Sequence, residues 1–270
     1  MTDRPTPKPT VRAPAWWKIA LEARAPFEFG AGIAALAPLL AIAPRGDGHP
    51  VLVYPGFGAS DRSTELLRRV LGLLGYHAVG WGAGRNTGMR PEWLAEGAAQ
   101  VRALQREHGR KVSLIGQSLG GIYAREVAKR AADAVRCVIT LGTPFTGPAQ
   151  ATNAWRLYEW VNGKAHRTGP LRDSVRAAPP VPTTSIYSRT DGVVAWQCSI
   201  EQPGRLAENI EIVGSHTGMA VNPVVLLAIA DRLAQPEGRW QPMQRNGLRR
   251  LAFRAPQQPV DFSVFAPAPG

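Results

Sequence analysis

The chain has 270 residues, of which 44% are hydrophobic and 19% are charged. This composition excludes wholesale disorder, and two cysteines exclude a disulfide scaffold. The net charge of +12 is compatible with a nucleic acid or an anionic membrane as partner, but the basic residues are scattered, with no block of five or six like charges. A solvated, arginine-rich surface is the simpler interpretation, so we expect no nucleic-acid partner.

The first 48 residues divide into two segments. Residues 1–26 are rich in Pro, Thr and basic residues and predict a disordered basic N-terminal arm. Residues 27–48 are mostly apolar and predict an N-terminal helix packed on the domain or at the mouth of its pocket. Its apolar run, residues 27–43, contains Glu28 and Pro38 and is shorter than the ~20 residues of a membrane span. We expect a cytoplasmic protein, with peripheral membrane contact, or export by a late signal peptide ending at Ala-Ile-Ala (41–43), as alternatives.

Short apolar runs alternate with helical patterns between residues 49 and 235, the predicted main domain. Such alternation predicts right-handed βαβ units, that is, an α/β fold with a mostly parallel sheet and helices on both faces. The predicted strands are 51–54, 77–81, 111–116, 135–141, 183–187 and 209–213, and the predicted helices are 64–74, 91–108, 119–132 and 220–234.

Two segments depart from this alternation. Residues 146–182 contain no strand signal, are too long for a plain connection and carry several aromatic residues, so they predict a small helical cap inserted between two strands. Residues 236–270 are rich in Pro and Arg and predict a C-terminal tail that follows the surface or hangs loose.

The segment 116–120 reads Gly-Gln-Ser-Leu-Gly, a Gly-x-Ser-x-Gly pattern. The pattern alone is weak, but here it lies between a predicted strand and a predicted helix. A turn this tight strains its central residue, and glycines two positions away on either side avoid a steric clash. Ser118 is therefore the predicted nucleophile, at the start of a helix whose dipole and N–H groups favour negative charge.

A nucleophilic serine needs a base, and the base needs an orienting acid. In this type of fold the chain order is Ser, then Asp or Glu, then His. His216 is the last histidine and follows the strand 209–213, so we predict that it is the base. Asp191 follows the strand 183–187 directly, whereas Glu201 lies further from the strand end. Asp191 is therefore the predicted acid.

An oxyanion formed at Ser118 needs two N–H donors. The backbone of Leu119, directly after the nucleophile, is one candidate. The other is the N–H of Phe57, in the loop 54–58 (Tyr-Pro-Gly-Phe-Gly) after the first strand, where Gly56 lets the chain turn close to the site. A tight turn without a donor role is the alternative for this loop.

These features together resemble the α/β-hydrolase superfamily, and within it the bacterial lipase and esterase branch, over residues 50–234. The Gly-Thr-Pro after the fourth strand is similar to that of lipases and membrane-lipid acyl hydrolases. Many such lipases carry His-Gly in the first loop, where this chain has Pro55 in place of the His. The resemblance implies cofactor-free hydrolysis through an acyl-enzyme. It rests on Pro-Gly-Phe-Gly at 55–58, Gly-Gln-Ser-Leu-Gly at 116–120, Leu-Gly-Thr-Pro-Phe-Thr-Gly at 141–147, Asp-Gly-Val-Val at 191–194, and His216.

Aromatic residues are the candidates for a substrate pocket. Trp155, Tyr158 and Trp160 of the predicted cap favour an apolar acyl site, because large aromatic faces suit a carboxylic ester. Trp196, near the predicted acid, is a further candidate. Packing of the cap onto the sheet explains the three cap residues equally well, and a position in the core is the alternative for Trp196. No cluster of His, Cys, Asp or Glu has metal-ligand spacing, so we predict no metal site.

The sequence therefore predicts a carboxylic ester hydrolase, an esterase or lipase acting on a small-molecule or lipid ester through a Ser-His-Asp triad. One alternative is an acyltransferase with the same triad and an acceptor other than water. The other is a catalytically silent hydrolase-like protein that docks on a membrane or a partner through its basic arms and the apolar residues 27–43.

Overall fold

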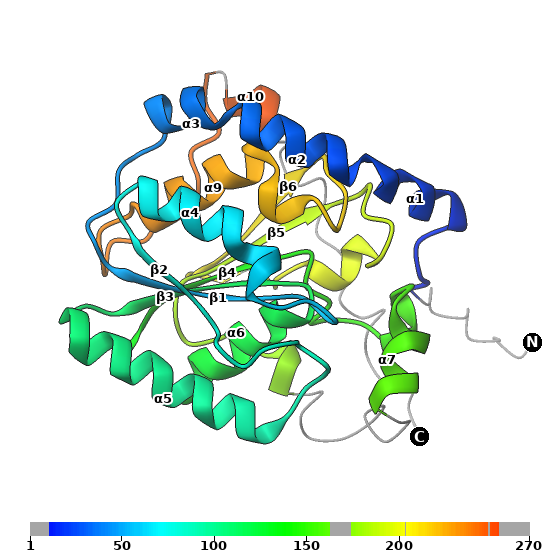
Figure 1. Ribbon diagram of the computed structural model, residues 1–270, viewed down its shortest axis with the longest axis horizontal. Helices are drawn as coiled ribbons and strands as arrows, with labels where there is room; N and C mark the ends of the chain where they lie inside the picture. Colours follow the sequence, from blue (N-terminus) through cyan, green and yellow to red (C-terminus); the bar gives the residue numbers. More distant parts are fainter. Residues whose placement is uncertain (1–10, 163–173, 203, 248, 254–270) are drawn as a thin grey trace, which may run out of the picture.

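A computed structural model describes residues 11–162, 174–202, 204–247 and 249–253. Six strands form one parallel sheet in the order β2-β1-β3-β4-β5-β6 (Figure 1). The predicted fold class is confirmed, with strand ends that differ by at most two residues. The strands are β1 (Pro50–Tyr54), β2 (His77–Gly80), β3 (Val112–Gln117), β4 (Val135–Leu141), β5 (Thr183–Ser188) and β6 (Ala207–Ile212).

The strand order reverses between β1 and β3. Strand β2 pairs with one side of β1, and β3 pairs with the other side. In open parallel sheets, ligand sites form beyond the carboxyl ends of the strands at such a reversal. The loops that follow β1 and β3, residues 55–58 and the turn at Ser118, both begin at this point.

Helices cover both faces of the sheet (Figure 1). Their bounds lie close to the predicted ones because the signals are local, such as the proline in the first turn of two of them. One layer holds α4 (Glu65–Leu73) and α9 (Pro223–Leu233), and the opposite layer holds α5 (Pro91–His108) and α6 (Leu119–Arg130).

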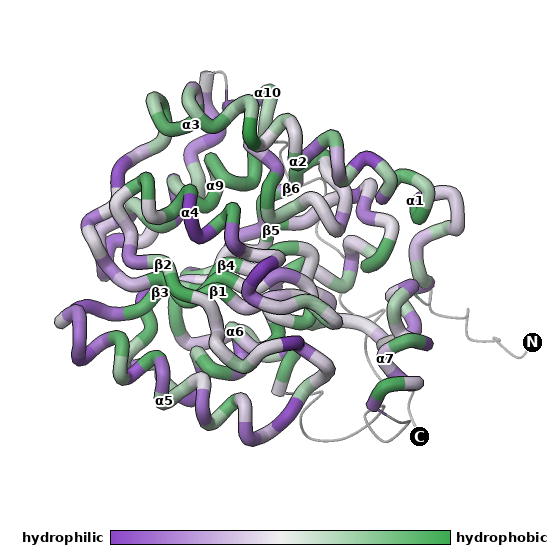
Figure 2. The backbone as a smooth tube through the Cα atoms, viewed as in Figure 1, coloured by the Kyte–Doolittle hydropathy of each residue, from purple (hydrophilic) through white to green (hydrophobic). Residues whose placement is uncertain are grey.

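Strand β1 contributes side chains to two hydrophobic cores, one on each face of the sheet. Val51 and Val53 belong to the apolar cluster that includes α4 and α9, whereas Leu52 and Tyr54 belong to the cluster that includes α5 and α6. Because both faces are covered, the strand is hydrophobic without alternation, and Figure 2 shows such hydrophobic stretches at the centre of the molecule.

The N-terminal segment differs from its prediction. Instead of a disordered arm over 1–26 and one helix over 27–48, the described part forms α1 (Trp16–Ala20), the 3-10 helix η1 (Leu21–Arg24), α2 (Ala25–Ala34) and α3 (Leu36–Ile42). Residues 1–10 lie outside the described part. The helices are held by contacts with distant loops, which composition does not reveal. No described helix alone is long and apolar enough to cross a membrane; the pair Trp16–Ala34 and Leu36–Ile42 meets that test only when counted together, with a bend of 56°.

The cap and the tail are described in part. Within 146–182 the structure contains η3 (Ala149–Ala151) and α7 (Trp155–Asn162), while 163–173 lie outside the described residues. The tail is not loose as far as it is described, because it includes α10 (Arg249–Ala252) and buries Met243 and Phe253 in the core. Three further 3-10 helices are η2 (Asp61–Thr64), η5 (Trp196–Ser199) and η6 (Met219–Val221).

Candidate active site

Ser118 occupies a strained turn between β3 and α6. Its φ of 51° is the only positive value among the described residues other than glycine. A Cβ atom on Gly116 would collide with the backbone of Gly120, and one on Gly120 would collide with the carbonyl oxygen of Tyr54. Strain of this kind persists only where the surrounding structure imposes it, and it is common at active sites. The geometry expected of the Gly-x-Ser-x-Gly turn is therefore present.

The start of α6 lies directly at this turn. Ser118 is the N-cap residue of the helix, and Leu119 is its first residue. The backbone N–H of Ser118 donates to the carbonyl of Leu141 over 2.8 Å, which ties the turn to the end of β4. Because the first N–H groups of a helix have no partner within it, they are suited to receive a developing negative charge.

His216 and Asp191 form a buried hydrogen-bonded pair. The Nδ1 atom of His216 lies 2.7 Å from Oδ2 of Asp191. The other carboxylate oxygen of Asp191 accepts from the N–H groups of Val193 and Val194. Glu201, the other acid considered, is instead paired with the buried Arg125. The chain order of the residues thus identified the acid that contacts the histidine.

The pKa of His216 is raised above its usual value. Burial alone would lower it by disfavouring the charged ring, but the charge and hydrogen bond of Asp191 and the charge of Glu22 outweigh burial. A protonated imidazole is therefore stabilised at this position, as a base that accepts a proton from a hydroxyl requires.

Several loops meet at this edge of the sheet. A Cβ atom on Gly142, after β4, would lie 3.0 Å from Nδ1 of His216 and 3.1 Å from Oδ2 of Asp191. The side chain of Gln117 donates to the carbonyl oxygen of His216 over 2.9 Å. Among the described residues no hydrogen bond joins the Ser118 hydroxyl to the imidazole; such bonds are often long without substrate and tighten in the complex.

Asn86 shapes the loop after β1 and was missed by sequence analysis. Its buried side chain donates to the carbonyl of Pro55 over 2.8 Å, and its own carbonyl accepts from the N–H of Gly58 over 2.7 Å. These bonds fix the loop on both sides of Phe57. An Asn in a glycine-rich segment carries no sequence signal for this role.

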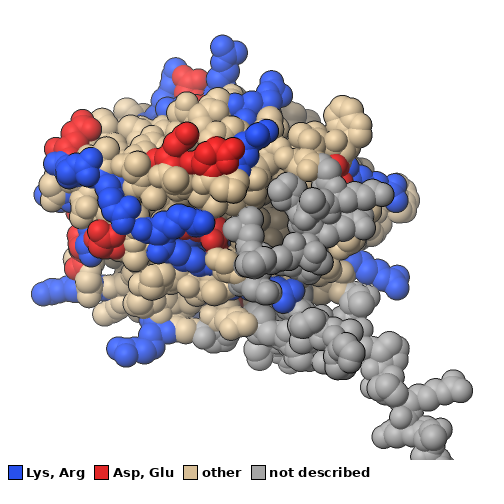
Figure 3. All heavy atoms as spheres, turned by 90° about the horizontal axis from the view of Figure 1, so that it is seen from below, with Lys and Arg blue, Asp and Glu red and all other residues tan. Residues whose placement is uncertain are grey.

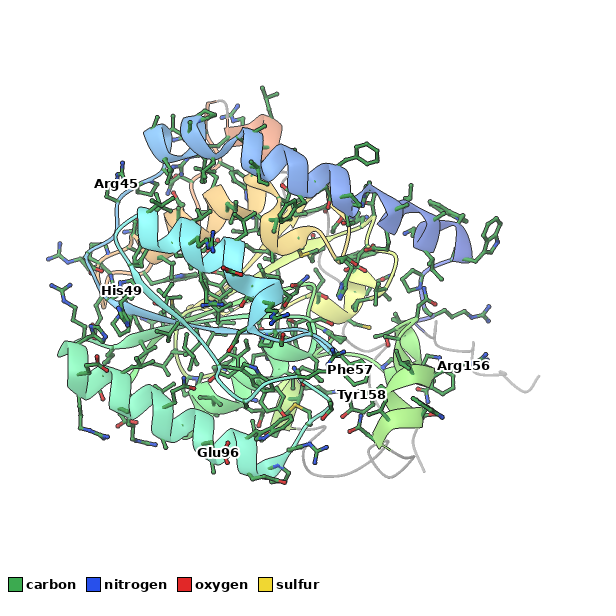
Figure 4. The ribbon with its side chains drawn as sticks, in the orientation of Figure 1. Arg45, His49, Phe57, Glu96, Arg156 and Tyr158 are labelled. Atoms are coloured by element: carbon green, nitrogen blue, oxygen red, sulfur yellow. The ribbon has the colours of Figure 1, made fainter. Side chains whose placement is uncertain are left out.

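Tyr158 is the predicted pocket residue that the structure places beside the loop after β1. Its ring centroid lies 5.3 Å from that of Phe57, and Figure 4 shows the two side chains close together, contributed by α7 and by that loop. The hydroxyl of Tyr158 accepts from the N–H of Met89. Helix α7 therefore packs against the loop that holds the predicted oxyanion donor.

The three predicted pocket tryptophans have other surroundings. Trp160 is 82% exposed, so it lies on the outer side of α7 and is not buried against the candidate site. The ring of Trp196 stacks on Tyr187 and lies under the guanidinium of Arg189. Trp155 lies beside the guanidinium of Arg156. An aromatic residue near a site in sequence can face any direction, because the helix rotation decides which side it occupies.

Glu22, from the N-terminal segment, reaches the loops that carry the acid and the histidine. Its Oε1 accepts from the N–H groups of His216 and Gly192, each over 2.9 Å, and its Oε2 accepts from the N–H and hydroxyl of Thr217, each over 3.0 Å. Burial acts to raise the pKa of Glu22, but the three N–H donors outweigh burial, so the pKa is lowered and the side chain stays ionised.

Glu28 makes a similar contact with Ser215, the residue before His216 in the same loop. Its carboxylate accepts from the N–H of Ser215 over 2.8 Å and from the Ser215 hydroxyl over 2.5 Å. Glu22 and Glu28 are the only acidic residues between positions 16 and 43. That isolation within an apolar segment was the available signal that they have specific partners.

Among the described residues, no three His, Cys, Asp or Glu side chains gather as a metal site would require.

Known proteins match this chain at the level of family and fold. A model of the alpha/beta hydrolase family matches residues 30–265. The chain resembles the crystal structure of Aspergillus fumigatus lipase B with a TM-score of 0.56 and 19% identity; the match covers 72% of this chain but only 55% of that lipase. No curated protein matches the chain.

Two further solved structures are matched over nearly their whole length. The mature form of Bacillus licheniformis lipase BlEst2 has a TM-score of 0.51 and 18% identity, with 72% of this chain and 95% of that chain covered. A structure from work on the metagenome-derived lipolytic enzymes LipS and LipT has a TM-score of 0.51 and 17% identity, with 70% and 96% covered. At these identities the likeness concerns the fold.

Proposed function

Because this chain belongs to the alpha/beta hydrolase family, we propose that it is a serine hydrolase of carboxylic esters that uses Ser118, His216 and Asp191. The observation that carries this proposal is the strained serine at a helix start, at the sheet edge where the buried His216–Asp191 pair also lies. A constellation of this kind is recognised by its geometry and roles rather than by its place in the sequence.

The first half of the proposed reaction forms an acyl-enzyme. His216 takes the proton of the Ser118 hydroxyl as the oxygen attacks the ester carbonyl. The carbonyl oxygen becomes negatively charged and is held by the backbone N–H groups of Phe57 and Leu119. Asp191 keeps the imidazole oriented and stabilises its positive charge. His216 then gives the proton to the leaving alcohol, and the acyl group stays on the serine.

The second half releases the acid. A water molecule gives a proton to His216 and attacks the acyl carbonyl, and the same N–H groups hold the oxyanion. His216 returns the proton to the Ser118 oxygen as the carboxylic acid leaves. No cofactor takes part in this scheme, and the acyl part of the ester would lie against the aromatic pair Phe57 and Tyr158.

A fluorophosphonate probe tests the nucleophile directly. The wild-type protein is expected to become labelled, and Ser118→Ala is expected to lose the label. Ser113→Ala, which changes a buried serine on the strand that precedes Ser118, is the matched control and should remain labelled. Labelling of the Ser118→Ala variant at the wild-type level would refute the proposal. Product analysis of an ester with an added alcohol separates hydrolysis from transfer to another acceptor.

A further inference from the structure

The outer face of the N-terminal helices is apolar without interruption. Every exposed position from 15 to 42 carries Ala, Gly, Pro or a larger apolar residue. In Figure 1 these helices run along the outside of the layer that also contains α4 and α9, and Figure 2 shows much of α2 and α3 as hydrophobic. The large side chains exposed here are Trp16, Trp17, Ile19, Phe27, Phe29, Ile33 and Ile42.

The charged residues of the same segment all turn toward the protein. Glu22 and Glu28 bond the loops described above, Lys18 donates to the carbonyl of Arg189, and Arg24 donates to Thr190. The polarity of this segment is thus the reverse of that of an ordinary surface helix, which turns its apolar side inward. A continuous apolar face of this kind marks an interaction surface.

Helix α7 adds a second apolar strip at the same edge of the sheet. Leu157, Trp160 and Val161 follow the spacing that places side chains on one side of a helix, and all three are exposed. The residues just before α7 contact the start of the N-terminal segment, since the side chain of Asn153 donates to the carbonyl of Pro14. The two strips therefore border the loops of the candidate site.

We propose that this face, formed by residues 16–42 and the outer side of α7, docks on an anionic lipid surface. The helices would lie in the plane of the interface, because none of them alone has the length and apolar character of a span. Trp16 and Trp17 suit the boundary between lipid headgroups and acyl chains, since their rings are apolar and their N–H groups are polar.

Charge favours a lipid surface with negative headgroups. The chain carries +12, and the exposed Arg12 and Arg156 lie next to the two apolar strips in sequence. Figure 3, which views the side of the molecule away from the N-terminal helices of Figure 1, shows basic side chains distributed among acidic ones rather than gathered in a stripe. A diffuse positive field attracts an anionic membrane over a Debye length, and the apolar face then supplies the short-range attachment.

Docking of this face would bring the candidate site to the lipid surface. The inner side of the same segment bonds directly to the loops of His216 and Asp191, so the site adjoins the docked face. An ester held in that surface would then be within reach of Ser118. This last step rests on the proposed function, whereas docking itself does not.

Flotation with vesicles tests docking apart from catalysis. Purified Ser118→Ala protein is mixed with vesicles of equimolar phosphatidylcholine and phosphatidylglycerol, or of phosphatidylcholine alone. We expect it to float with the anionic vesicles and to bind them less as salt rises. Adding Phe27→Ser and Ile33→Ser should weaken binding about tenfold or more, because two large exposed apolar side chains no longer insert. Leu73→Ser, at an apolar position on α4 that is about as exposed as Ile33, is the control and should not weaken it.

Three results would overturn the proposal. One is a folded protein, with an unchanged melting curve, that binds neither vesicle. Another is equal binding by the Phe27→Ser/Ile33→Ser variant and the Leu73→Ser control. The third is a dimer in light scattering without lipid that the double substitution converts to a monomer, because the face would then belong to a second copy of the chain. Hydrolase activity is not measured in this test, so failure of the proposed function would not imitate any of these results.

Discussion

Two clusters of Ser, His and Asp lie at opposite edges of the sheet. At the amino edge, Nδ1 of His49 is 2.5 Å from Asp47, and its Nε2 is 2.8 Å from the hydroxyl of Ser113. All three members are thus connected, whereas at the carboxyl edge the described bond joins only His216 and Asp191. Yet Ser113 and His49 are fully buried and no substrate reaches them. Connectivity alone therefore does not make a catalytic site.

The backbone distinguishes the two serines. Ser113 lies within β3, where its N–H and carbonyl belong to the sheet, whereas Ser118 has a φ of 51° at the start of α6. Only the second position offers N–H donors for an oxyanion. The turn and the helix start make Ser118 a nucleophile candidate, and their absence leaves Ser113 a structural residue.

The pKa values of the two histidines are shifted in opposite directions. Burial is the main cause that lowers the pKa of His49, and nearby Arg136 and Arg110 act in the same direction against Asp47. The pKa of His216 is raised, because Asp191 and Glu22 outweigh burial. His49 is thereby kept neutral as a packing group, while His216 is prepared to carry a proton.

Replacing each serine by alanine should give the largest difference in activity between the two clusters. Ser118→Ala should lower kcat on p-nitrophenyl esters by about 10³-fold or more, because the nucleophile is lost. Ser113→Ala should keep its activity and lose about 1–3 kcal/mol of stability, because its hydroxyl bonds His49 and Cys137 and the buried ring of His49 would be left unpaired. Steady-state kinetics and urea unfolding measure the two effects. A large loss of activity in Ser113→Ala, with stability retained, would contradict the comparison.

Replacing each aspartate by asparagine is the next contrast. Asp191→Asn should lower kcat/KM by about 10²- to 10⁴-fold, since the imidazole loses its orienting charge and its correct tautomer. Asp47→Asn should change kcat/KM little, because its histidine is buried at the other edge. If both variants retained wild-type kinetics, the role of Asp191 would have to be abandoned.

Glu22→Gln tests the contact from the N-terminal segment. Removing this negative charge should lower the pKa of His216, so the acid limb of the kcat/KM profile, which marks deprotonation of the base, moves to lower pH. Glu28→Gln is the matched control, because Glu28 bonds Ser215 and its removal should leave the limb in place. Kinetics from pH 5 to 9 compare the two; an unmoved limb in Glu22→Gln would show that its role is packing alone.

The pH dependence of stability should have opposite signs for the two histidines. The folded pKa of His49 is depressed, so its contribution is complete above the unfolded pKa of about 6.5 and is lost as pH falls below it. The folded pKa of His216 is raised, so its contribution is complete below about 6.5 and is lost as pH rises through the folded value.

Urea unfolding of His49→Gln and His216→Gln between pH 5 and 8 measures these slopes. Each substitution should remove up to about 1.4 kcal/mol per pH unit of slope, with opposite sign. Slopes of the same sign in the two variants would contradict the assignment.

Local signals determined much of this protein in advance. The period of apolar residues located the strands and helices, and the glycines around Ser118 identified the strained turn, because both depend on neighbours within a few residues. The position of Asp191 directly after a predicted strand selected it over Glu201, which lies further from the end of that strand; this signal is local too.

Only the tertiary structure decided which distant residues meet. Periodicity in the sequence does not reveal the order of the strands or the exposed position of Trp160. It also does not reveal that Glu22 bonds the backbone of His216 or that Asn86 bonds the loop after β1. Contacts between segments far apart in the chain depend on how whole elements pack, so their partners are selected by shape and by buried polar groups that must be satisfied. For the same reason the sequence predicted a disordered arm that includes residues 16–26, although the charged side chains of these residues bond the loops of the site.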